Sequence, residues 1–247
     1  MKIDAHVRIG ASREASLEVD ELLGTLTELG IDAALIAPSE AQIAFANRDG
    51  NIATTTAAAR SDGRLFPYAI ASPWRPDACN ELAWARDAGA VALALDPVLQ
   101  GFDVLDGLID PLIEFAQAAG WPVYIRTGTP PTGLPLPVAS LARRYPETAF
   151  IMGRSGATDF WIDAAPALVH AANLYADTSY APWDTVLSEF ARNPEIGTGR
   201  VVFATDAPYT VPSAELRRIV DWKISDAERV AVLGGTLARL LGLAVTV

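Results

Sequence analysis

Residues 90–95, Ala90-Val91-Ala92-Leu93-Ala94-Leu95, form an unbroken apolar run of the length of a β-strand. A run that is apolar throughout, rather than at alternate positions, is typical of a strand buried on both faces of a parallel sheet. An amphipathic segment follows at Leu105–Ala119, and Pro111 within it predicts that its helix starts or kinks there. After Gly120, which is placed to end that helix, a second apolar run begins at Pro122. The stretch therefore predicts one strand–helix–strand unit.

The same unit recurs along the whole chain of 247 residues. Eight apolar runs alternate with helical patterns, and eight such repeats in about 250 residues are typical of a (β/α)8 TIM barrel. A doubly wound open sheet is the alternative, although the first run is followed by no G-x-G-x-x-G motif that would support nucleotide binding. We expect a single domain over residues 1–247, closed at its bottom or side by two helical pieces in Ser225–Leu243. The eight runs are Lys2–Val7, Asp32–Ala37, Leu65–Ala71, Ala90–Leu95, Pro122–Ile125, Ala149–Gly153, Leu174–Asp177 and Val201–Ala204.

Composition and charge exclude several classes of protein. The net charge is −11, with 51% hydrophobic and 20% charged residues, which is not the composition of a disordered chain. A pI near 4.6 argues against binding to nucleic acid or to an anionic membrane, because both require a basic surface. The one cysteine, Cys79, cannot form an internal disulfide, and the opening Met1-Lys2-Ile3-Asp4 lacks the apolar core of a signal peptide. We therefore expect a cytoplasmic protein that binds neither nucleic acid nor membranes.

Polar side chains gather at the ends of the predicted strands, where barrels of this class carry their chemistry. His6 and Arg8 end the first run and, being two residues apart, lie on the same side of the strand. Tyr124 precedes Arg126 by two residues, so it is expected to point inward but deeper in the barrel. The other strand-end candidates are Trp74, Asp96, Arg154, Asp177, Ser179 and Asp206, with Tyr180, Trp183 and Tyr209 as candidates for the pocket walls.

Several of these strand ends resemble motifs of the amidohydrolase-related proteins, the group that contains aminocarboxymuconate-semialdehyde decarboxylase-like enzymes. Asp4–Gly10 is similar to the family's D-x-H-x-H-x-G, Pro122–Gly128 to its P-V-x-x-H-T-G, and Phe203–Pro208 to its F-x-S-D-x-P. The resemblance covers most of the chain and implies a metal-dependent-hydrolase-like barrel with hydrolase or decarboxylase activity. In that family, the first-strand histidine pair, the fifth-strand histidine and the eighth-strand aspartate hold a divalent metal.

The chain departs from the family at these metal-binding positions. Only His6 and Asp206 match, whereas Arg8, Arg126 and Arg154 stand where family members have histidine. Arginine is always charged and has no lone pair to offer a metal. We therefore expect no metal ligands and no cofactor, since a divalent metal such as zinc would require nearby aspartates to rearrange.

Arginines in place of histidines suggest that the site binds an anion. We expect an amidohydrolase-like enzyme, of the hydrolase or of the lyase or cyclase type, that acts without the family metal on a small carboxylate-bearing metabolite. His6 is the expected catalytic acid or base and Asp206 its partner. The alternative is a catalytically inactive homologue that is an assembly partner or ligand-binding protein, and we expect a homodimer or a heterodimer with an active homologue. The expected substrate-binding residues are Arg8, Arg126, Arg154, Asp96, Trp74 and Tyr124.

Overall fold

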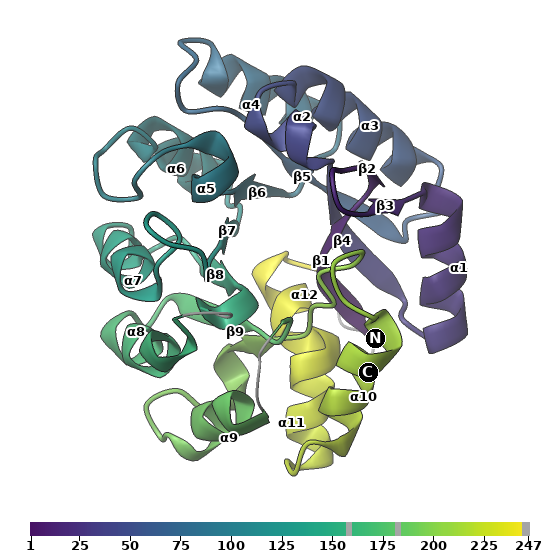
Figure 1. Ribbon diagram of the computed structural model, residues 1–247, viewed down its shortest axis with the longest axis vertical. Helices are drawn as coiled ribbons and strands as arrows, with labels where there is room; N and C mark the ends of the chain where they lie inside the picture. The colour runs from purple at the N-terminus through teal and green to yellow at the C-terminus, as the bar shows by residue number, and fades with distance from the viewer. Residues whose placement is uncertain (157–159, 181–183, 244–247) are drawn as a thin grey trace.

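The computed structural model describes residues 1–156, 160–180 and 184–243, and it contains a sheet of eight parallel strands in chain order (Figure 1). Each of the eight predicted apolar runs contains one of these strands or overlaps it. The strands are β1 (Ile3–Arg8), β4 (Ala33–Ala37), β5 (Leu65–Ala69), β6 (Ala92–Leu95), β7 (Val123–Arg126), β8 (Phe150–Gly153), β9 (Leu174–Asp177) and β10 (Val201–Val202).

Backbone hydrogen bonds join the last strand region to the first. The N–H groups of Ala5 and Arg8 donate to the carbonyls of Phe203 and Ala207, both at 2.8 Å. In return, the N–H of Asp206 donates to the carbonyl of His6 at 3.0 Å. Sequential strand order together with this closure makes a (β/α)8 TIM barrel, which confirms the predicted fold and excludes the doubly wound sheet.

Helices surround the strands and bury their outer face (Figure 1). The predicted helix over Leu105–Ala119 begins at Asp110, and Pro111 lies in its first turn, where its missing N–H is not needed. None of the helices in the described ranges is long and apolar enough to cross a membrane. A short hairpin joins β2 (Gly10–Ala11) to β3 (Ser16–Leu17). The α-helices are α1 (Val19–Leu29), α2 (Glu40–Ala44), α3 (Asn47–Ala59), α4 (Ala78–Asp87), α5 (Pro97–Gln100), α6 (Asp110–Ala118), α7 (Pro135–Arg144), α8 (Ala164–His170), α9 (Asp184–Arg192), α10 (Pro212–Asp221), α11 (Asp226–Val230) and α12 (Thr236–Leu240).

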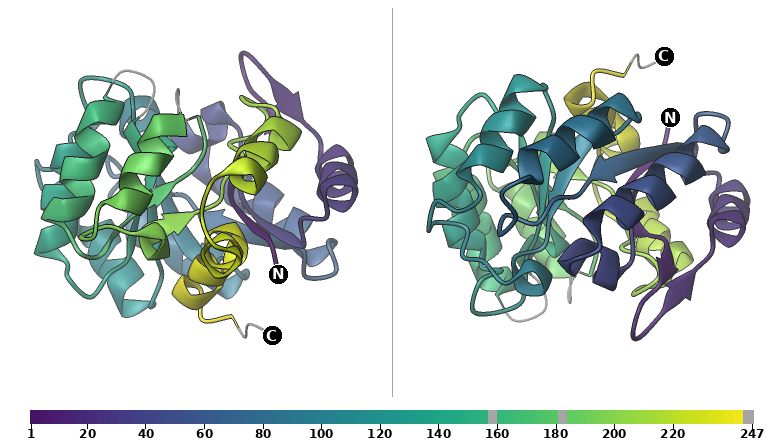
Figure 2. Two further views of the ribbon diagram at one scale, coloured as in Figure 1. Left: turned by 90° about the horizontal axis from the view of Figure 1, so that it is seen from below. Right: turned by 90° about the horizontal axis from the view of Figure 1, so that it is seen from above.

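The C-terminal helices close one end of the barrel, as the sequence predicts. Leu237 and Ala238 of α12 are fully buried and belong to the apolar cluster inside the barrel. Just before α12, Gly234 lies so close to the start of β1 that a Cβ atom would come within 2.4 Å of the Met1 carbonyl oxygen. Figure 2 shows that the β2–β3 hairpin lies at the opposite end from the N-terminus and α12. That opposite end is where the strands finish and the candidate site forms.

Candidate active site

His6, on β1, and Asp206, after β10, form a buried hydrogen-bonded pair at the mouth of the barrel. The distance from His6 Nδ1 to Asp206 Oδ1 is 3.1 Å. Burial lowers the pKa of His6 to about 4, so its imidazole is neutral at pH 7. Burial by itself would raise the pKa of Asp206, but the hydrogen bond with His6 and the charges of Arg154 and Arg126 hold it well below its usual range. Because Asp206 is a carboxylate, the imidazole proton lies on Nδ1, and Nε2 carries the lone pair.

Three arginines from different strand ends share two aspartates at this mouth. Arg8 Nη2 donates to Asp96 Oδ2 at 2.6 Å, and Arg126 Nη1 lies 3.4 Å from the same oxygen. Arg154 contacts Asp206 Oδ2 through Nη2 at 2.6 Å and Nε at 2.8 Å. Arg126 Nη2 lies 3.9 Å from that oxygen. The two ends of the cluster are therefore linked by Arg126.

Two further aspartates near the cluster make no ion pair with its guanidinium groups. Asp4 accepts hydrogen bonds from the Thr205 hydroxyl and from backbone N–H groups, while Asp177 accepts the N–H of Arg154. Burial raises the pKa of Asp4 to about 7 and that of Asp177 to about 8, so Asp177 is mostly protonated at pH 7. Three guanidinium groups against the carboxylates of Asp96 and Asp206 leave an excess of positive charge at the mouth.

Arg8 has donors that no described residue satisfies. Its residue surface is 2% exposed, and its Nε and Nη1 atoms have no hydrogen-bond partner among the residues that the structure describes. These atoms carry three N–H bonds. Leaving donors of a charged group buried and unpaired costs free energy, so these atoms require an acceptor, which either an ordered water or a bound anion supplies.

Tyr124 forms the floor beneath His6, as its position on β7 predicts. The two rings are parallel, with an interplanar angle of 2° and centroids 4.4 Å apart. The Tyr124 hydroxyl donates to Asp177 Oδ2 at 2.8 Å. Space for the ring depends on Gly153 at the end of β8, because a Cβ atom there would lie 2.3 Å from the Tyr124 hydroxyl oxygen. The small residue on one strand thus positions the aromatic side chain of its neighbour.

The aromatic residues predicted around the pocket have different locations. Trp74 is 62% exposed, and its indole N–H donates to the Gln100 carbonyl at 2.9 Å. The Gln100 side chain in turn accepts the N–H of Asp96, so among the described residues Trp74 is linked to the cluster only through Gln100. Tyr180 lies on the guanidinium of Arg154, with 4.3 Å from Cζ to the ring centroid. Trp183 lies outside the described residues.

Tyr209, which follows Asp206 by three residues, has its ring against all three guanidinium groups. The distances from its centroid to the Cζ atoms of Arg8, Arg126 and Arg154 are 5.7, 5.1 and 5.6 Å. Its hydroxyl donates to Glu40 Oε1 at 2.9 Å. Sequence reasoning places Tyr209 near the pocket but misses Glu40 entirely, since no sequence signal links two residues 169 positions apart.

Backbone strain is concentrated at the same place. Arg154, Ser155, Tyr180 and Asp206 all have φ between 46° and 62°, a left-handed conformation that non-glycine residues seldom adopt. Each such residue costs about 1–3 kcal/mol, and strain of this kind collects at active and binding sites. The strained residues follow β8, β9 and β10, the strands that supply Arg154, Asp177 and Asp206.

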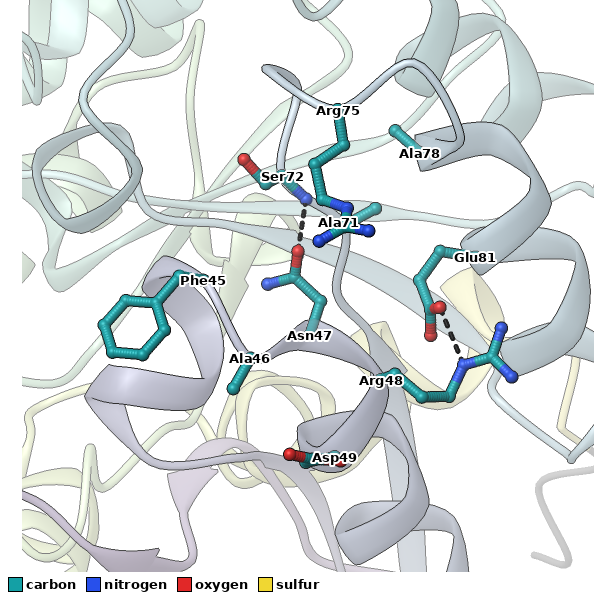
Figure 3. A pocket seen from close by; sticks show the side chains of 10 residues that line it. All are labelled: Phe45, Ala46, Asn47, Arg48, Asp49, Ala71, Ser72, Arg75, Ala78 and Glu81. Atoms are coloured by element: carbon teal, nitrogen blue, oxygen red, sulfur yellow. Dashed lines mark hydrogen bonds and ion pairs between the residues drawn. The ribbon is translucent and has the colours of Figure 1, made fainter.

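Little open space remains among the charged side chains. The cavity lined by His6, Arg8, Asp96, Tyr124 and Arg126 measures about 10 Å³, which is at the lower limit for one water molecule. A larger pocket of about 150 Å³ lies to the side, between the start of α3 and the loop after β5 (Figure 3). None of the predicted site residues lines that pocket. The predicted charged residues meet in the barrel mouth, where a ligand needs side chains to move; they are His6, Arg8, Asp96, Arg126, Arg154 and Asp206.

The strand order and the closure of the sheet define a (β/α)8 TIM barrel with a charged site at its mouth. The family model described as amidohydrolase matches residues 3–243, and the chain belongs to that family. A comparison with curated proteins finds no match.

Several solved structures share the fold at low sequence identity. A dihydroxybenzoic acid decarboxylase from Polaromonas sp. JS666 has a TM-score of 0.75 at 16% identity, covering 98% of this chain and 96% of that one. A 5-carboxyvanillate decarboxylase from Novosphingobium aromaticivorans has a TM-score of 0.75 at 15% sequence identity, and the match covers 98% of this chain and 96% of that one. A 2,6-dihydroxybenzoate decarboxylase from Rhizobium has a TM-score of 0.75 at 16% sequence identity, and the match covers 98% of this chain and 99% of that one.

These structures correct one expectation. The prediction that no metal cofactor is involved is wrong for this family, because the Polaromonas and Novosphingobium enzymes were solved with bound manganese. The side chains described here nevertheless do not form the ligand set of such a metal. They include no group of three or more His, Cys, Asp or Glu residues that could hold a metal ion, and guanidinium groups offer donors rather than lone pairs. Manganese therefore does not fit the barrel mouth with the side chains as they lie.

Proposed function

We propose that this amidohydrolase-family protein is an enzyme of the lyase type that removes the carboxylate of a small hydroxylated aromatic acid. The observation that carries the proposal is Arg8, a buried cation with donors unsatisfied by any described residue, 2.6 Å from Asp96. The decarboxylases of the same fold act, by their names, on dihydroxybenzoate and carboxyvanillate, and these are the first substrates to test.

The arginine cluster is suited to hold the substrate carboxylate. Its excess positive charge attracts an anion, and charge-assisted hydrogen bonds from guanidinium groups to carboxylate are among the strongest in proteins. The free N–H groups of Arg8 supply the first contacts, and Arg126 and Arg154 provide further positive charge beside them. The bound anion would also satisfy the donors that are otherwise buried without an acceptor.

His6 is the proposed proton carrier. Its neutral ring accepts the proton of a substrate hydroxyl at Nε2, while Asp206 holds Nδ1 and stabilises the imidazolium. The resulting phenolate feeds electrons into the ring, and His6 returns the proton to the ring carbon that bears the carboxylate. The carbon–carbon bond then breaks, and carbon dioxide leaves. The hydroxybenzoate anion thus becomes a phenolate and carbon dioxide, with the same proton moved from oxygen to carbon.

Turnover of 2,6-dihydroxybenzoate and 5-carboxyvanillate tests this proposal. Purified protein is incubated with each acid, once with MnCl2 and once with a chelator, and released carbon dioxide is measured. Removal of a general base costs about 10²–10⁴ in rate, so His6→Gln should lose at least about a hundredfold. His170→Gln is the matched control, because this second histidine lies on α8 with Arg143 as its partner and should retain full activity. Absence of turnover under both conditions would reject the catalytic role.

A catalytically inactive homologue is the second candidate, and the ion pairs favour it. Asp96 and Asp206 already engage all three arginines, and the space among them is about 10 Å³. Such a protein would bind an aromatic acid without converting it, or would be an assembly partner as a homodimer or beside an active homologue. Binding of 2,6-dihydroxybenzoate without release of carbon dioxide would favour this function over the enzyme.

A further inference from the structure

Tyr209 bridges the mouth of the barrel above the arginine cluster. It lies in the loop between β10 and α10, and its ring is within 5.7 Å of the Cζ atoms of Arg8, Arg126 and Arg154. An aromatic face attracts cations, so the ring is held where the positive charge is concentrated. The same face therefore covers the groups that the proposed function assigns to the substrate carboxylate.

A hydrogen bond fixes Tyr209 to the other side of the mouth. Its hydroxyl donates to Glu40 Oε1, and Glu40 is the first residue of α2, which follows β4. The N–H of Glu40 donates in turn to the Ser12 hydroxyl at 3.2 Å. Since β4 and the β10 region both flank β1, the Tyr209–Glu40 bond spans the end of the strand that carries Arg8.

The open space beside Arg8 is too small for a substrate. The cavity between Arg8, Asp96 and Arg126 measures about 10 Å³, so an aromatic carboxylate cannot reach the free donors of Arg8 while every side chain keeps its position. Arg8 and Asp96 are buried and paired with each other. The Tyr209 side chain is instead partly buried and uncharged, and its only side-chain hydrogen bond among the described residues is to Glu40, so it is displaced more easily than this buried ion pair.

We propose that Tyr209 is a gate over the arginine cluster and that Glu40 is its latch. In the closed state the Tyr209 ring lies against the guanidinium groups. In the open state the bond to Glu40 is broken and the ring moves aside, so that an aromatic carboxylate takes its place on the arginines. That the ligand is an aromatic carboxylate rests on the proposed function. The existence of a closed and an open state does not depend on it.

Chemical modification of the arginines with phenylglyoxal tests the gate without any substrate. The variants are Tyr209→Phe, which keeps the ring and removes the hydroxyl, Glu40→Ala, and the two combined. One hydrogen bond to a carboxylate corresponds to a change of about tenfold in an opening equilibrium. Each single variant should therefore raise the modification rates of Arg126 and Arg154 by about tenfold, and the double variant should raise them no further. Equal rates in all variants, or additive effects, would overturn the gate.

Matched controls separate gating from unfolding. Tyr145→Phe changes another tyrosine beside an arginine, Arg144, far from the mouth, and should leave the rates at Arg126 and Arg154 unchanged. The half-exposed Arg48 should react at the same rate in every variant. A faster reaction of Arg48 in a variant would indicate partial unfolding of that variant. The rates at Arg126 and Arg154 would then be compared in the Tyr209→Phe protein and the unmodified chain, at a lower temperature chosen so that their circular dichroism spectra agree.

Association of 2,6-dihydroxybenzoate, followed by stopped-flow fluorescence, connects the gate to the ligand. The association rate constant should rise by about tenfold in Tyr209→Phe, the factor expected for loss of one hydrogen bond to a carboxylate. Faster arginine modification without any binding of this acid would support the gate and contradict the proposed function. Binding with unchanged association and unchanged modification rates would support the function and overturn the gate.

Discussion

Arg8 and Asp96 form a buried ion pair, with 2.6 Å between Nη2 and Oδ2 and side chains that are 2% and 5% exposed. The aspartate satisfies one end of the guanidinium, and Nε and Nη1 have no acceptor among the described residues. The pair holds the arginine in place at the end of β1 without using up its donors. That arrangement is suited to a binding site, because the remaining N–H groups can donate to a further acceptor.

Loss of Asp96 should destabilise the protein strongly. Asp96→Ala leaves Arg8 buried with no carboxylate, and breaking a buried ion pair in this way costs about 3–5 kcal/mol. Urea denaturation measures the change in the free energy of unfolding. Asp77→Ala is the control, because its exposed pair with Arg75 should be worth less than about 1 kcal/mol. Equal effects of the two variants would contradict the burial of the Arg8–Asp96 pair.

Gly153 should be required for the position of Tyr124. In Gly153→Ala the new methyl group overlaps the tyrosine ring, and overpacking of this kind costs about 1–3 kcal/mol. Thermal unfolding should show the loss. Gly24→Ala, in the interior of α1 with nothing within 4 Å of the new Cβ, should instead be neutral or stabilising by up to about 1 kcal/mol. A Gly153→Ala protein as stable as the unmodified chain would show that Tyr124 does not occupy this space.

The buried neutral His6 should make the fold sensitive to acid. Its pKa falls from 6.5 when unfolded to about 4 when folded, so between these values the unfolded chain binds a proton that the native state does not. Stability should therefore decrease as pH falls from 6.5 to 4, by about 3 kcal/mol at one residue. The raised pKa values of Asp4 and Asp177 act in the opposite direction, between pH 3.8 and about 7 for Asp4 and between pH 3.8 and about 8 for Asp177.

The His6 contribution is isolated by comparison with His6→Gln. Because Asp4 and Asp177 are common to both proteins, the difference between their free energies of unfolding reports the contribution of His6. That difference should change by about 3 kcal/mol between pH 7 and pH 4, with the unmodified chain losing more stability in acid. A difference that is independent of pH would contradict the depressed pKa.

The sequence predicts the barrel and the residues that meet at its mouth because both depend on local patterns. Continuous apolar runs specify strands buried on both faces, and the two-residue spacing of His6 and Arg8 puts both side chains on the inner side of β1. The position of Tyr124 below Arg126 follows from the same period. These inferences need only the periodicity of one strand and the rule that strands of a barrel end together.

Other features depend on contacts that no local pattern encodes. The sequence does not specify which aspartate pairs with which arginine, and Asp4 and Asp177 bond to Thr205 and Tyr124 instead. Trp74 is exposed and bonds to the Gln100 carbonyl, and the bond between Tyr209 and Glu40 joins the loop after β10 to the start of α2. The expectation about the metal failed for another reason: it was drawn from this chain's ligands alone, whereas solved enzymes of the same fold hold manganese.

Calorimetric titration with 2,6-dihydroxybenzoate, with and without MnCl2, tests whether the arginines hold a substrate carboxylate. Each charge-assisted hydrogen bond is worth about 1.5–3 kcal/mol, which is about tenfold to a hundredfold in a binding constant. Arg8→Ala should therefore weaken binding by at least about tenfold relative to the unmodified chain. Arg75→Ala, at an exposed position, should bind as the unmodified chain does. Binding that is equally tight in Arg8→Ala, or no binding by the unmodified chain under either condition, would contradict a carboxylate site built on Arg8.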